Sequence, residues 1–363
     1  MEKEIIYNSD QAMQLAISEA YKGAPFVSPN PLVGCVVLNS QGQLLSKGYH
    51  QKYGEAHAEI NAIKNLTSEQ LVDATVYVTL EPCAHQGKTG SCAETLKKYK
   101  LKKVVYGLQD PNPLVSGQGA KILDSAGIKT ELYQGILTNE LENLAEIFLK
   151  NFRSKKTFVA MKVASSLDGQ IALANGESQW ISTEASREYV HELRSHYDAI
   201  LVGRKTIEID NPSLNIRHFK IIKENKLIIL DPFGTLLTSI QSGKKYKFLE
   251  MHKKENIFFA VKTKIETEFQ TITFTNLQNL MNQVFQLKIM SIFVEGGANT
   301  YSSFFKEDLV DRLHLFMNAS VIGQKNGLSW TSGFGLNQLS EKKKLSSVIT
   351  KSFGQDLYLT GRF

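Results

Sequence analysis

Long apolar segments are absent from this sequence of 363 residues. Its apolar runs, such as 33–38 and 227–230, are far shorter than the roughly 20 residues that a membrane-spanning helix needs. The first residues are polar and lack the apolar centre of a signal peptide. We therefore expect a cytoplasmic protein without a membrane partner.

Cysteine is scarce, with three residues in the chain. An odd count, with two cysteines at zinc-ligand spacing, does not fit a disulfide framework and agrees with a reducing compartment. The third, Cys35, lies in the apolar run 33–38, where the sequence favours a small buried core residue over a reactive thiol.

The excess of positive charge is small, at +6, and the lysines occur as pairs and one triplet. No basic stripe carries interleaved aromatic residues, so the sequence predicts no nucleic-acid partner. A hydrophobic content of 42% and a charged content of 21% are typical of globular proteins. A chain of this length has room for two domains, each with its own core.

Signals for helices and strands alternate along the chain, which predicts an α/β protein. A polar, basic break at 150–156 suggests one domain at 1–152 and a second at 153–363. In the first domain we expect strands at 32–38, 44–49, 75–80, 103–108 and 128–133. We expect its helices from about Ser9, whose hydroxyl would cap the helix, from His57, after Cys92, at 117–125 and from about Thr138.

The second domain repeats the α/β pattern. We expect strands at 157–164, 199–202, 227–230, 257–260 and 291–294, and helices at 183–196, 277–287 and 298–305. The segment 233–255 is rich in lysine and poorly periodic, which favours a surface excursion. The tail 356–363 alternates as an edge strand does.

The segment 57–92 carries the ligand types of a catalytic zinc. His57, Cys83 and Cys92 supply one imidazole and two thiolates, which leaves a fourth position open for water. Glu59 follows the histidine by two residues and would move protons. The order His-x-Glu followed by Pro-Cys and a second cysteine is that of zinc deaminases, which act on nucleobases. Here eight residues separate the cysteines instead of two, and the longer loop carries His85 and Lys88.

A structural zinc is the alternative, with His85 as its fourth ligand. Glu59 would then have no purpose, and Glu81-Pro82-Cys83 is what the deaminase pattern requires, so the sequence favours a catalytic zinc. We expect a zinc-activated water to attack an amino-bearing ring carbon while Glu59 transfers protons to the ring nitrogen and the leaving ammonia.

Two adjacent glycines mark the second domain. Gly296 and Gly297 lie between a predicted strand and a predicted helix, where backbone N–H groups can approach a phosphate. A Gly-Gly pair is also a common turn. The Gly-x-Gly-x-x-Gly pattern is absent, which disfavours a Rossmann dinucleotide site.

Several motifs together resemble the bifunctional deaminase/reductase family of riboflavin biosynthesis, known as RibD or RibG. In the first half they are 30–35 (NPLVGC), 48–50 (GYH), 57–59 (HAE), 81–92 with its long cysteine spacing, and 110–119. In the second half they are 162–169 (KVASSLDG), 176–181 (GESQWI), 203–206 (GRKT) and 210–217 (DNPSLNIR). The resemblance implies a cytidine-deaminase-like α/β/α sandwich followed by an α/β domain like dihydrofolate reductase.

The resemblance also implies a substrate for each domain. The first would deaminate 2,5-diamino-6-(5-phosphoribosylamino)pyrimidin-4-one, a small phosphorylated pyrimidine. By match, its substrate contacts would come from Asn30, His50, His85, Lys88, Asp110 and Asn112. The proline-rich surroundings of Asn30, Asp110 and Asn112 also suit plain turns, so that reading stays open.

The second domain would use NADPH to reduce the ribosyl chain of the deaminated product to a ribityl chain. By match, the cofactor would contact Ala164, Trp180, Thr206, Asp210, Gly297, Ala298, Asn299, Thr300, Tyr301, Ser302 and Ser303. By the same match, the substrate would contact Ser178, Arg194, Leu214, Arg217 and Glu295. Lys162 would be a catalytic cation beside the reacting imine, although a surface lysine is the plain alternative. We also expect a homo-oligomer, either a dimer or a tetramer.

Two other functions remain possible on the sequence. A nucleic-acid-editing deaminase would share the zinc ligands, but it needs a basic aromatic surface and normally the short cysteine spacing. A second domain that is only a scaffold would not need Lys162, Thr206, Asp210, Arg217 and Glu295, all of which are present.

Overall fold

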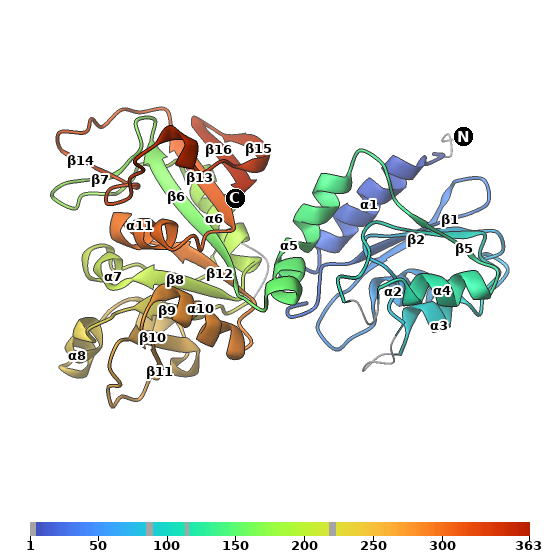
Figure 1. Cartoon of the computed structure of the whole chain (residues 1–363), viewed down its shortest axis with the longest axis horizontal. Coiled ribbons are helices and arrows are strands. Elements are labelled where there is room, and N and C mark those ends of the chain that lie inside the picture. Colours follow the sequence, from blue (N-terminus) through green and yellow to red (C-terminus); the bar gives the residue numbers. More distant parts are fainter. Residues whose placement is uncertain (1–4, 85–89, 113–115, 218–222) are drawn as a thin grey trace. The chain divides into compact units, whose positions relative to one another are not determined.

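The computed structural model describes residues 5–84, 90–112, 116–217 and 223–363 (Figure 1). The chain divides into two compact units, 1–154 and 155–363, which are described separately below. Within the described residues, no helix is both long enough and apolar enough to cross a bilayer.

The first unit is built on a five-stranded mixed sheet in the order β2-β1-β3-β4-β5. Strand β1 runs antiparallel to both β2 and β3, whereas β3, β4 and β5 are parallel. The strands are β1 (Gly34–Leu38), β2 (Leu44–Tyr49), β3 (Thr75–Val78), β4 (Lys103–Tyr106) and β5 (Lys129–Leu132). The predicted hairpin between β1 and β2 is confirmed.

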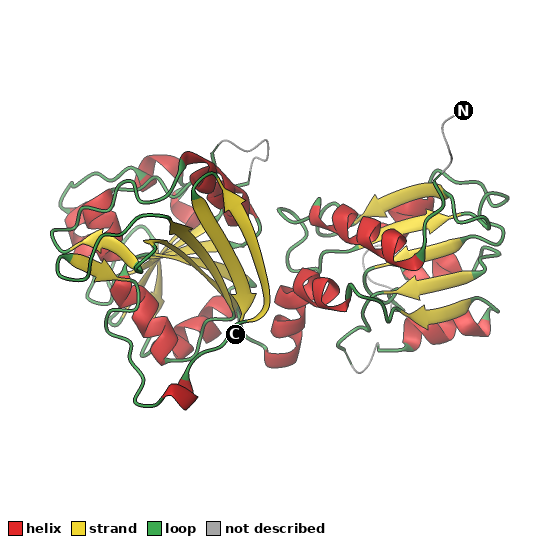
Figure 2. Cartoon of the chain, turned by 90° about the horizontal axis from the view of Figure 1, so that it is seen from above, coloured by secondary structure: helices red, strands yellow, loops and turns green. Residues whose placement is uncertain are grey.

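Helices cover both faces of this sheet, as Figure 2 shows. Alternate residues of β1 point to opposite faces. Val36 and Leu38 pack with α1 (Ser9–Tyr21) and α5 (Thr138–Ser154). Cys35 and Val37 pack with α2 (Ala58–Ile63), α3 (Cys92–Leu96) and α4 (Gln118–Ser125). The α/β/α sandwich is therefore confirmed, and Cys35 is a buried core residue as predicted.

Asn8, and not Ser9, caps helix α1. The Asn8 side chain accepts a hydrogen bond from the Gln11 N–H at 2.9 Å, and the Gln11 side chain accepts one from the Asn8 N–H at 3.0 Å. This capping box places Ser9 inside the helix, so the predicted start is right and the predicted cap is wrong by one residue.

The second unit holds a nine-stranded sheet in the order β11-β10-β9-β8-β12-β6-β13-β16-β15. Its pairings are parallel from β11 to β13 and antiparallel between β13, β16 and β15. The strands are β6 (Phe158–Ser166), β8 (Ala199–Gly203), β9 (Lys226–Leu230), β10 (Ile257–Val261), β11 (Gln270–Thr273), β12 (Ser291–Glu295), β13 (Arg312–Asn318), β15 (Ser346–Phe353) and β16 (Asp356–Arg362). A separate ribbon pairs β7 (Gln170–Leu173) with β14 (Gly327–Ser329).

Two hydrophobic cores flank the large sheet. One contains apolar residues of α10 (Leu277–Gln286) and α11 (Ala298–Lys306), and the other contains residues of α7 (Arg204–Asp210), α8 (Thr235–Gln241) and α9 (Phe248–Met251). Helix α6 (Glu184–Ser195) packs through Tyr189, whose ring stacks on that of Phe353 with centroids 4.7 Å apart.

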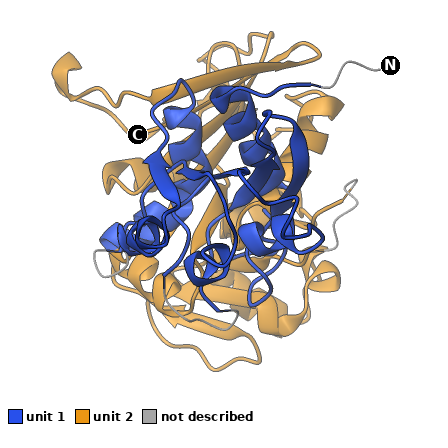
Figure 3. Ribbon diagram, turned by 90° about the vertical axis from the view of Figure 1, so that its right-hand side faces the viewer, with its two compact units in different colours: residues 1–154 blue, residues 155–363 orange. Residues whose placement is uncertain are grey.

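Two expectations about the second half of the chain are wrong. The segment 233–255 is not a surface excursion, because Leu236, Leu237 and Phe248 are buried in one of the two cores. The tail forms β16, which lies between β13 and β15, so the edge strand is the polar β15. Helix α5 ends at Ser154, inside the polar segment 150–156. The two units divide between residues 154 and 155 (Figure 3).

Candidate functional site

Three predicted ligands converge in the first unit. His57 is the N-cap of α2 and Cys92 is the first residue of α3, while Cys83 lies in the loop after β3. The His57 Nδ1 atom lies 3.5 Å from the Cys83 Sγ and 3.3 Å from the Cys92 Sγ. A tetrahedral zinc with Zn–S of about 2.3 Å and Zn–N of about 2.0 Å separates such ligand atoms by about 3.5 Å. The three side chains therefore fit a zinc ion.

The surroundings of the Cys83 and Cys92 thiols favour a thiolate that can bind a cation. The pKa of Cys83 is lowered to about 4, because the Cys92 side chain donates to its sulfur and His57 and the Cys92 N–H also stabilise the thiolate. The pKa of Cys92 is raised by that same interaction with Cys83 and by burial. The pair thus shares one proton, which a soft dication would displace on binding.

Glu59 lies in the first turn of α2, and its residue is 3% exposed. Burial and the nearby Cys83 thiolate raise the pKa of its carboxyl group to about 7, although His57 opposes the shift. A carboxyl group that titrates near neutral pH can both take and return a proton.

These groups open into a pocket of about 300 Å³, a size that suits a small aromatic ring. Its lining includes His57, Glu59 and Cys83 together with Asn30, Pro31, Val33, His50, Tyr53, Gly54, Glu55, Leu80, Glu81, Gly90, Asp110 and Phe148. The sequence reasoning missed Tyr53, Glu55, Glu81 and Phe148. The Glu-Pro-Cys motif was a signal for Glu81, whereas Phe148 comes from α5 and has no local signal.

Asn30 and His50 form a polar pair in the pocket wall. The His50 Nδ1 lies 3.1 Å from the Ala56 carbonyl oxygen, and its Nε2 lies 3.0 Å from the Asn30 Nδ2. Burial lowers the pKa of His50, so the ring is neutral, with Nδ1–H donating to Ala56 and Nε2 accepting from Asn30. The amide nitrogen of Asn30 is thereby directed at His50.

The other predicted contacts of the first unit have mixed outcomes. Asp110 lines the pocket, and its carboxylate also accepts a hydrogen bond from the Asn112 N–H at 2.8 Å, as in a turn. Asn112 is not among the described residues that line the pocket. His85 and Lys88 lie outside the described residues, so their predicted contacts stay predictions.

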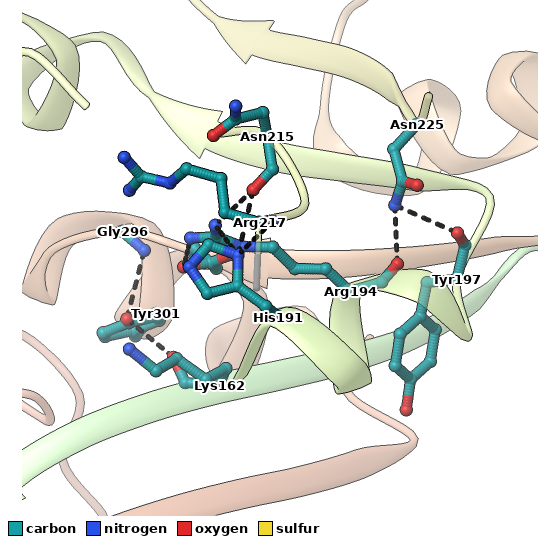
Figure 4. A network of polar contacts seen from close by, with 10 residues as sticks. Lys162, His191, Arg194, Tyr197, Asn215, Arg217, Asn225, Gly296 and Tyr301 are labelled. Atoms are coloured by element: carbon teal, nitrogen blue, oxygen red, sulfur yellow. Dashed lines mark hydrogen bonds and ion pairs between the residues drawn. The ribbon is translucent and has the colours of Figure 1, made fainter. Parts of the chain in front are cut away.

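A network of polar contacts around Arg194 lies in the second unit (Figure 4). The Arg194 Nε and Nη2 atoms donate to the two carboxylate oxygens of Glu295 at 2.6 and 3.0 Å. Both side chains are 11% exposed. Burial raises the pKa of Glu295, but Arg194 and Lys162 outweigh it, so the net shift is downward and Glu295 is ionised.

Lys162 belongs to the same cluster. It lies on β6, which pairs in parallel with β12, the strand that ends at Glu295. Burial lowers the pKa of its ammonium group, while Glu295 opposes the shift. Lys162 is therefore not a solvated surface lysine, and Ala164 points to the same face of the strand two residues later.

Gly296 and Gly297, which were both expected to offer N–H groups to a phosphate, differ in their hydrogen bonds. The Tyr301 hydroxyl accepts from the Gly296 N–H at 3.1 Å and donates to the Lys162 carbonyl oxygen at 2.8 Å. The Gly296 N–H is therefore engaged within the protein. Gly297 is the N-cap of α11 and has no capping side chain, so the N–H groups of the first turn suit an anionic part of a dinucleotide.

The remaining predicted cofactor contacts surround this helix start. A Cβ atom on Gly203 would lie 2.6 Å from the Thr300 Oγ1, so the end of β8, which leads into Thr206, packs closely against α11. The Ser178 hydroxyl donates to Asp210 at 3.0 Å. Trp180 is 70% exposed, with the Arg187 guanidinium 4.5 Å above its ring, so it is not a core residue.

The side chains of the later predicted cofactor contacts, residues 301–303 of α11, form hydrogen bonds within the protein. Tyr301 and Ser302 are buried, Ser302 donates to the Ser332 carbonyl oxygen, and Ser303 donates to that of Asn299. Contacts from these three residues to a dinucleotide would not come from their hydroxyl groups in this arrangement. The first turn at Gly297, Ala298 and Asn299 is the part that fits a ligand.

The last two predicted substrate contacts lie in the loop after α7. Leu214 is buried and has a positive φ of 53°, which bends the chain sharply. Arg217 is exposed, and within the described part of the chain its side chain makes no ion pair.

The comparisons with known proteins follow the division of the chain. Residues 7–108 match the cytidine and deoxycytidylate deaminase zinc-binding region, and residues 157–359 match the RibD C-terminal domain. The riboflavin biosynthesis protein RibD of Actinobacillus pleuropneumoniae is 35% identical over 96% of this chain and 93% of its own length. That of Bacillus amyloliquefaciens is 36% identical, over 96% and 94%.

Solved structures agree over the full length. RibD from Acinetobacter baumannii has a TM-score of 0.83 at 33% identity and covers 97% of this chain and 98% of its own. A diaminohydroxyphosphoribosylaminopyrimidine deaminase/5-amino-6-(5-phosphoribosylamino)uracil reductase from Thermotoga maritima has a TM-score of 0.84 at 33% identity and covers 97% of each chain. The chain therefore belongs to the RibD family of riboflavin biosynthesis, bifunctional enzymes with a zinc-binding deaminase domain and an NADPH-dependent reductase domain.

Proposed function

We propose that the first unit hydrolytically deaminates 2,5-diamino-6-(5-phosphoribosylamino)pyrimidin-4-one, and that the second reduces the ribosyl chain of the resulting 5-amino-6-(5-phosphoribosylamino)uracil to a ribityl chain. The observation that carries the proposal is the pocket in which two members of the ligand cluster, His57 and Cys83, and the buried Glu59 meet the polar pair Asn30 and His50. The Thermotoga maritima relative has these two activities in its name.

In the deamination, His57, Cys83 and Cys92 would hold the zinc. When bound, zinc supplies a water molecule of lowered pKa as the nucleophile at neutral pH. Glu59 takes the proton of the attacking water and returns protons to the ring nitrogen and to the leaving ammonia. Asn30, His50 and Asp110 line the pocket and hold the edge of the pyrimidine, and Asn112, His85 and Lys88 are further proposed contacts.

In the reduction, NADPH supplies the hydride. The cofactor would lie along the start of α11, at Gly297, Ala298 and Asn299, with Ala164, Trp180, Thr206 and Asp210 as neighbours. The ammonium group of Lys162, whose charge interacts with the buried carboxylate of Glu295, would act as a general acid and donate a proton to the imine nitrogen of the opened sugar. Arg217 and Ser178 would contact the substrate, the arginine at the phosphate.

The working location and assembly are proposed on the sequence. We propose that the enzyme works in the cytoplasm as a homo-oligomer and takes no nucleic acid as substrate. Gel filtration with light scattering tests the assembly, and a monomeric mass for the active enzyme would contradict it.

One coupled assay tests both reactions. The purified protein is supplied with the phosphoribosylaminopyrimidine, and ammonia release and NADPH oxidation are followed separately. We expect ammonia to be released even when NADPH is absent. We expect NADPH to be oxidised only when the deaminated product is present. Absence of ammonia release would refute the deaminase substrate, and absence of NADPH oxidation with added deaminated product would refute the reductase substrate.

A further inference from the structure

A loop with unusual backbone angles carries Arg217. It follows α7, and both Asn211 and Leu214 have positive φ angles, of 40° and 53°. Such angles are uncommon for residues with side chains and persist only where the surroundings hold them. The contacts that hold the far end of this loop come from helix α6.

Two residues of α6, one turn apart, reach the loop (Figure 4). The Arg194 Nη1 atom donates to the Asn215 carbonyl oxygen at 2.9 Å. The main-chain N–H of Arg217 donates to the Nδ1 atom of His191 at 3.1 Å. Both contacts are to main-chain atoms of the loop. They therefore fix the backbone position at Asn215 and Arg217 independently of the two side chains.

His191 must be neutral and must accept at Nδ1. The Arg217 N–H and the Arg194 Nη1, which is 3.4 Å away, are both donors directed at this atom. The Asn215 carbonyl oxygen, at 3.1 Å, is the one acceptor near Nδ1, against these two donors. The surroundings therefore favour the tautomer that carries its hydrogen on Nε2. Burial and the two arginines lower the pKa of His191 to about 4, which agrees with a neutral ring.

The contact between His191 and the main chain of Arg217 determines where the Arg217 side chain begins. His191 is 8% exposed, whereas Arg217 is exposed and, in Figure 4, extends away from the imidazole. The guanidinium of Arg194 is occupied by Glu295 and Asn215. Arg217 is thus the arginine of this cluster that is available to a phosphate.

We propose that His191 is a positioning residue of the reductase, whose Nδ1 atom holds the main chain of Arg217 so that its guanidinium meets the phosphate of the substrate. The proposal rests on the proposed function of the second unit. His191 does not touch the reacting atoms, and its effect passes through Arg217.

Three variants separate positioning from a general effect on folding. His191→Leu removes the acceptor, and His191→Asn restores one, because the Asn side-chain oxygen can occupy the place of Nδ1. Should the leucine variant not fold, His191→Met supplies a second apolar side chain. Each protein is assayed for NADPH oxidation with the deaminated substrate and with its dephosphorylated counterpart, and ammonia release checks that the first unit is intact.

We expect His191→Leu to raise KM for the phosphorylated substrate about tenfold with kcat within about twofold, since a remote binding contact is lost. His191→Asn should return KM to within about threefold of the wild type. The dephosphorylated substrate should not discriminate between the proteins. In the pair with Arg217→Ala, the double variant should be no worse than Arg217→Ala alone.

Other outcomes would overturn the proposal. An unchanged KM in His191→Leu, an equal loss with the dephosphorylated substrate, or additive losses in the double variant would each show that His191 does not act through Arg217. Failure of the proposed function looks different, because the wild-type protein itself would then not oxidise NADPH with the deaminated substrate.

Discussion

Single side chains determine the chemistry of the first unit. Glu59 is buried, and it follows the zinc ligand His57 by two residues in the chain. The pKa of its carboxyl group is raised to about 7. Of the described acids that line the pocket, Glu81 accepts three backbone N–H groups and Asp110 accepts the N–H of its own turn. Glu59 is the acid that suits proton transfer.

Replacing this acid should stop deamination alone. We expect Glu59→Gln to lower the rate of ammonia release by at least about 100-fold, because glutamine keeps the shape but cannot accept the proton. Bound zinc, measured by atomic absorption, should stay at the wild-type level, and NADPH oxidation with deaminated substrate should be unchanged. A variant that retains full deamination would contradict the proton-transfer role.

Glu81 joins two elements of the first unit. Its carboxylate accepts from the N–H groups of Asp110 at 3.2 Å, Gly117 at 3.0 Å and Ala120 at 3.4 Å. Helix α4 has a glycine N-cap without a capping side chain, so this distant acid does the capping. The same bonds hold Asp110 at the pocket.

An amide at this position should disturb both the helix and the pocket. Glutamine can accept at only one of its two ends, so Glu81→Gln is expected to destabilise the protein by about 2 kcal/mol and to raise KM for deamination several-fold. Urea unfolding and steady-state kinetics measure the two effects. Glu131→Gln, which changes an exposed acid paired with Lys103, is the matched control and should alter neither.

Strand β13 carries a buried histidine that makes the second unit sensitive to acid. The two ring nitrogens of His314 contact the hydroxyl groups of Tyr197 and Tyr358 at 2.8 and 2.7 Å. Burial, with Arg312 and His196 nearby, lowers the pKa of His314 well below its usual value. The folded protein therefore keeps this ring neutral at a pH where the unfolded chain binds a proton.

The sign of the pH effect follows from linkage. As the pH falls below the unfolded pKa of about 6.5, the unfolded state gains a proton that the folded state does not, so stability decreases. The slope for one such group is about 1.4 kcal/mol per pH unit. Urea unfolding at pH 7.5 and 5.5 should show this loss, and His314→Gln should reduce it. An unchanged slope in the variant would contradict the assignment.

At the scale of the whole molecule, each unit has its own sheet and its own hydrophobic cores. The zinc ligands belong entirely to the first unit, and Lys162, Arg194 and Glu295 belong entirely to the second. Each reaction therefore has a complete set of proposed catalytic groups within one unit.

Removal of zinc should separate the two activities. After treatment with a chelator, we expect ammonia release to fall to background and NADPH oxidation with pre-deaminated substrate to keep most of its rate. Added zinc should restore ammonia release. Loss of both activities on chelation, with both returning on zinc addition, would show that the reductase also depends on the metal.

The sequence by itself determined the elements whose patterns are local. His57, Glu59, Cys83 and Cys92 could be assigned because a zinc site requires particular residue types in a particular order. Helix α6 and strand β2 were predicted within a residue, since their caps and periodicity lie within the element. The resemblance of the motifs carried the assignment of both reactions.

Only the tertiary structure decided which distant segments meet. The packing of 233–255 into a core depends on apolar residues in α8 and α9, and each of these helices is too short to show a helical period. The place of β16 inside the sheet depends on its partners β13 and β15. The pocket contact of Phe148 and the contact of His191 with the Arg217 backbone join residues far apart in the chain. A sequence pattern reports the period of one element, whereas these contacts depend on the packing of several.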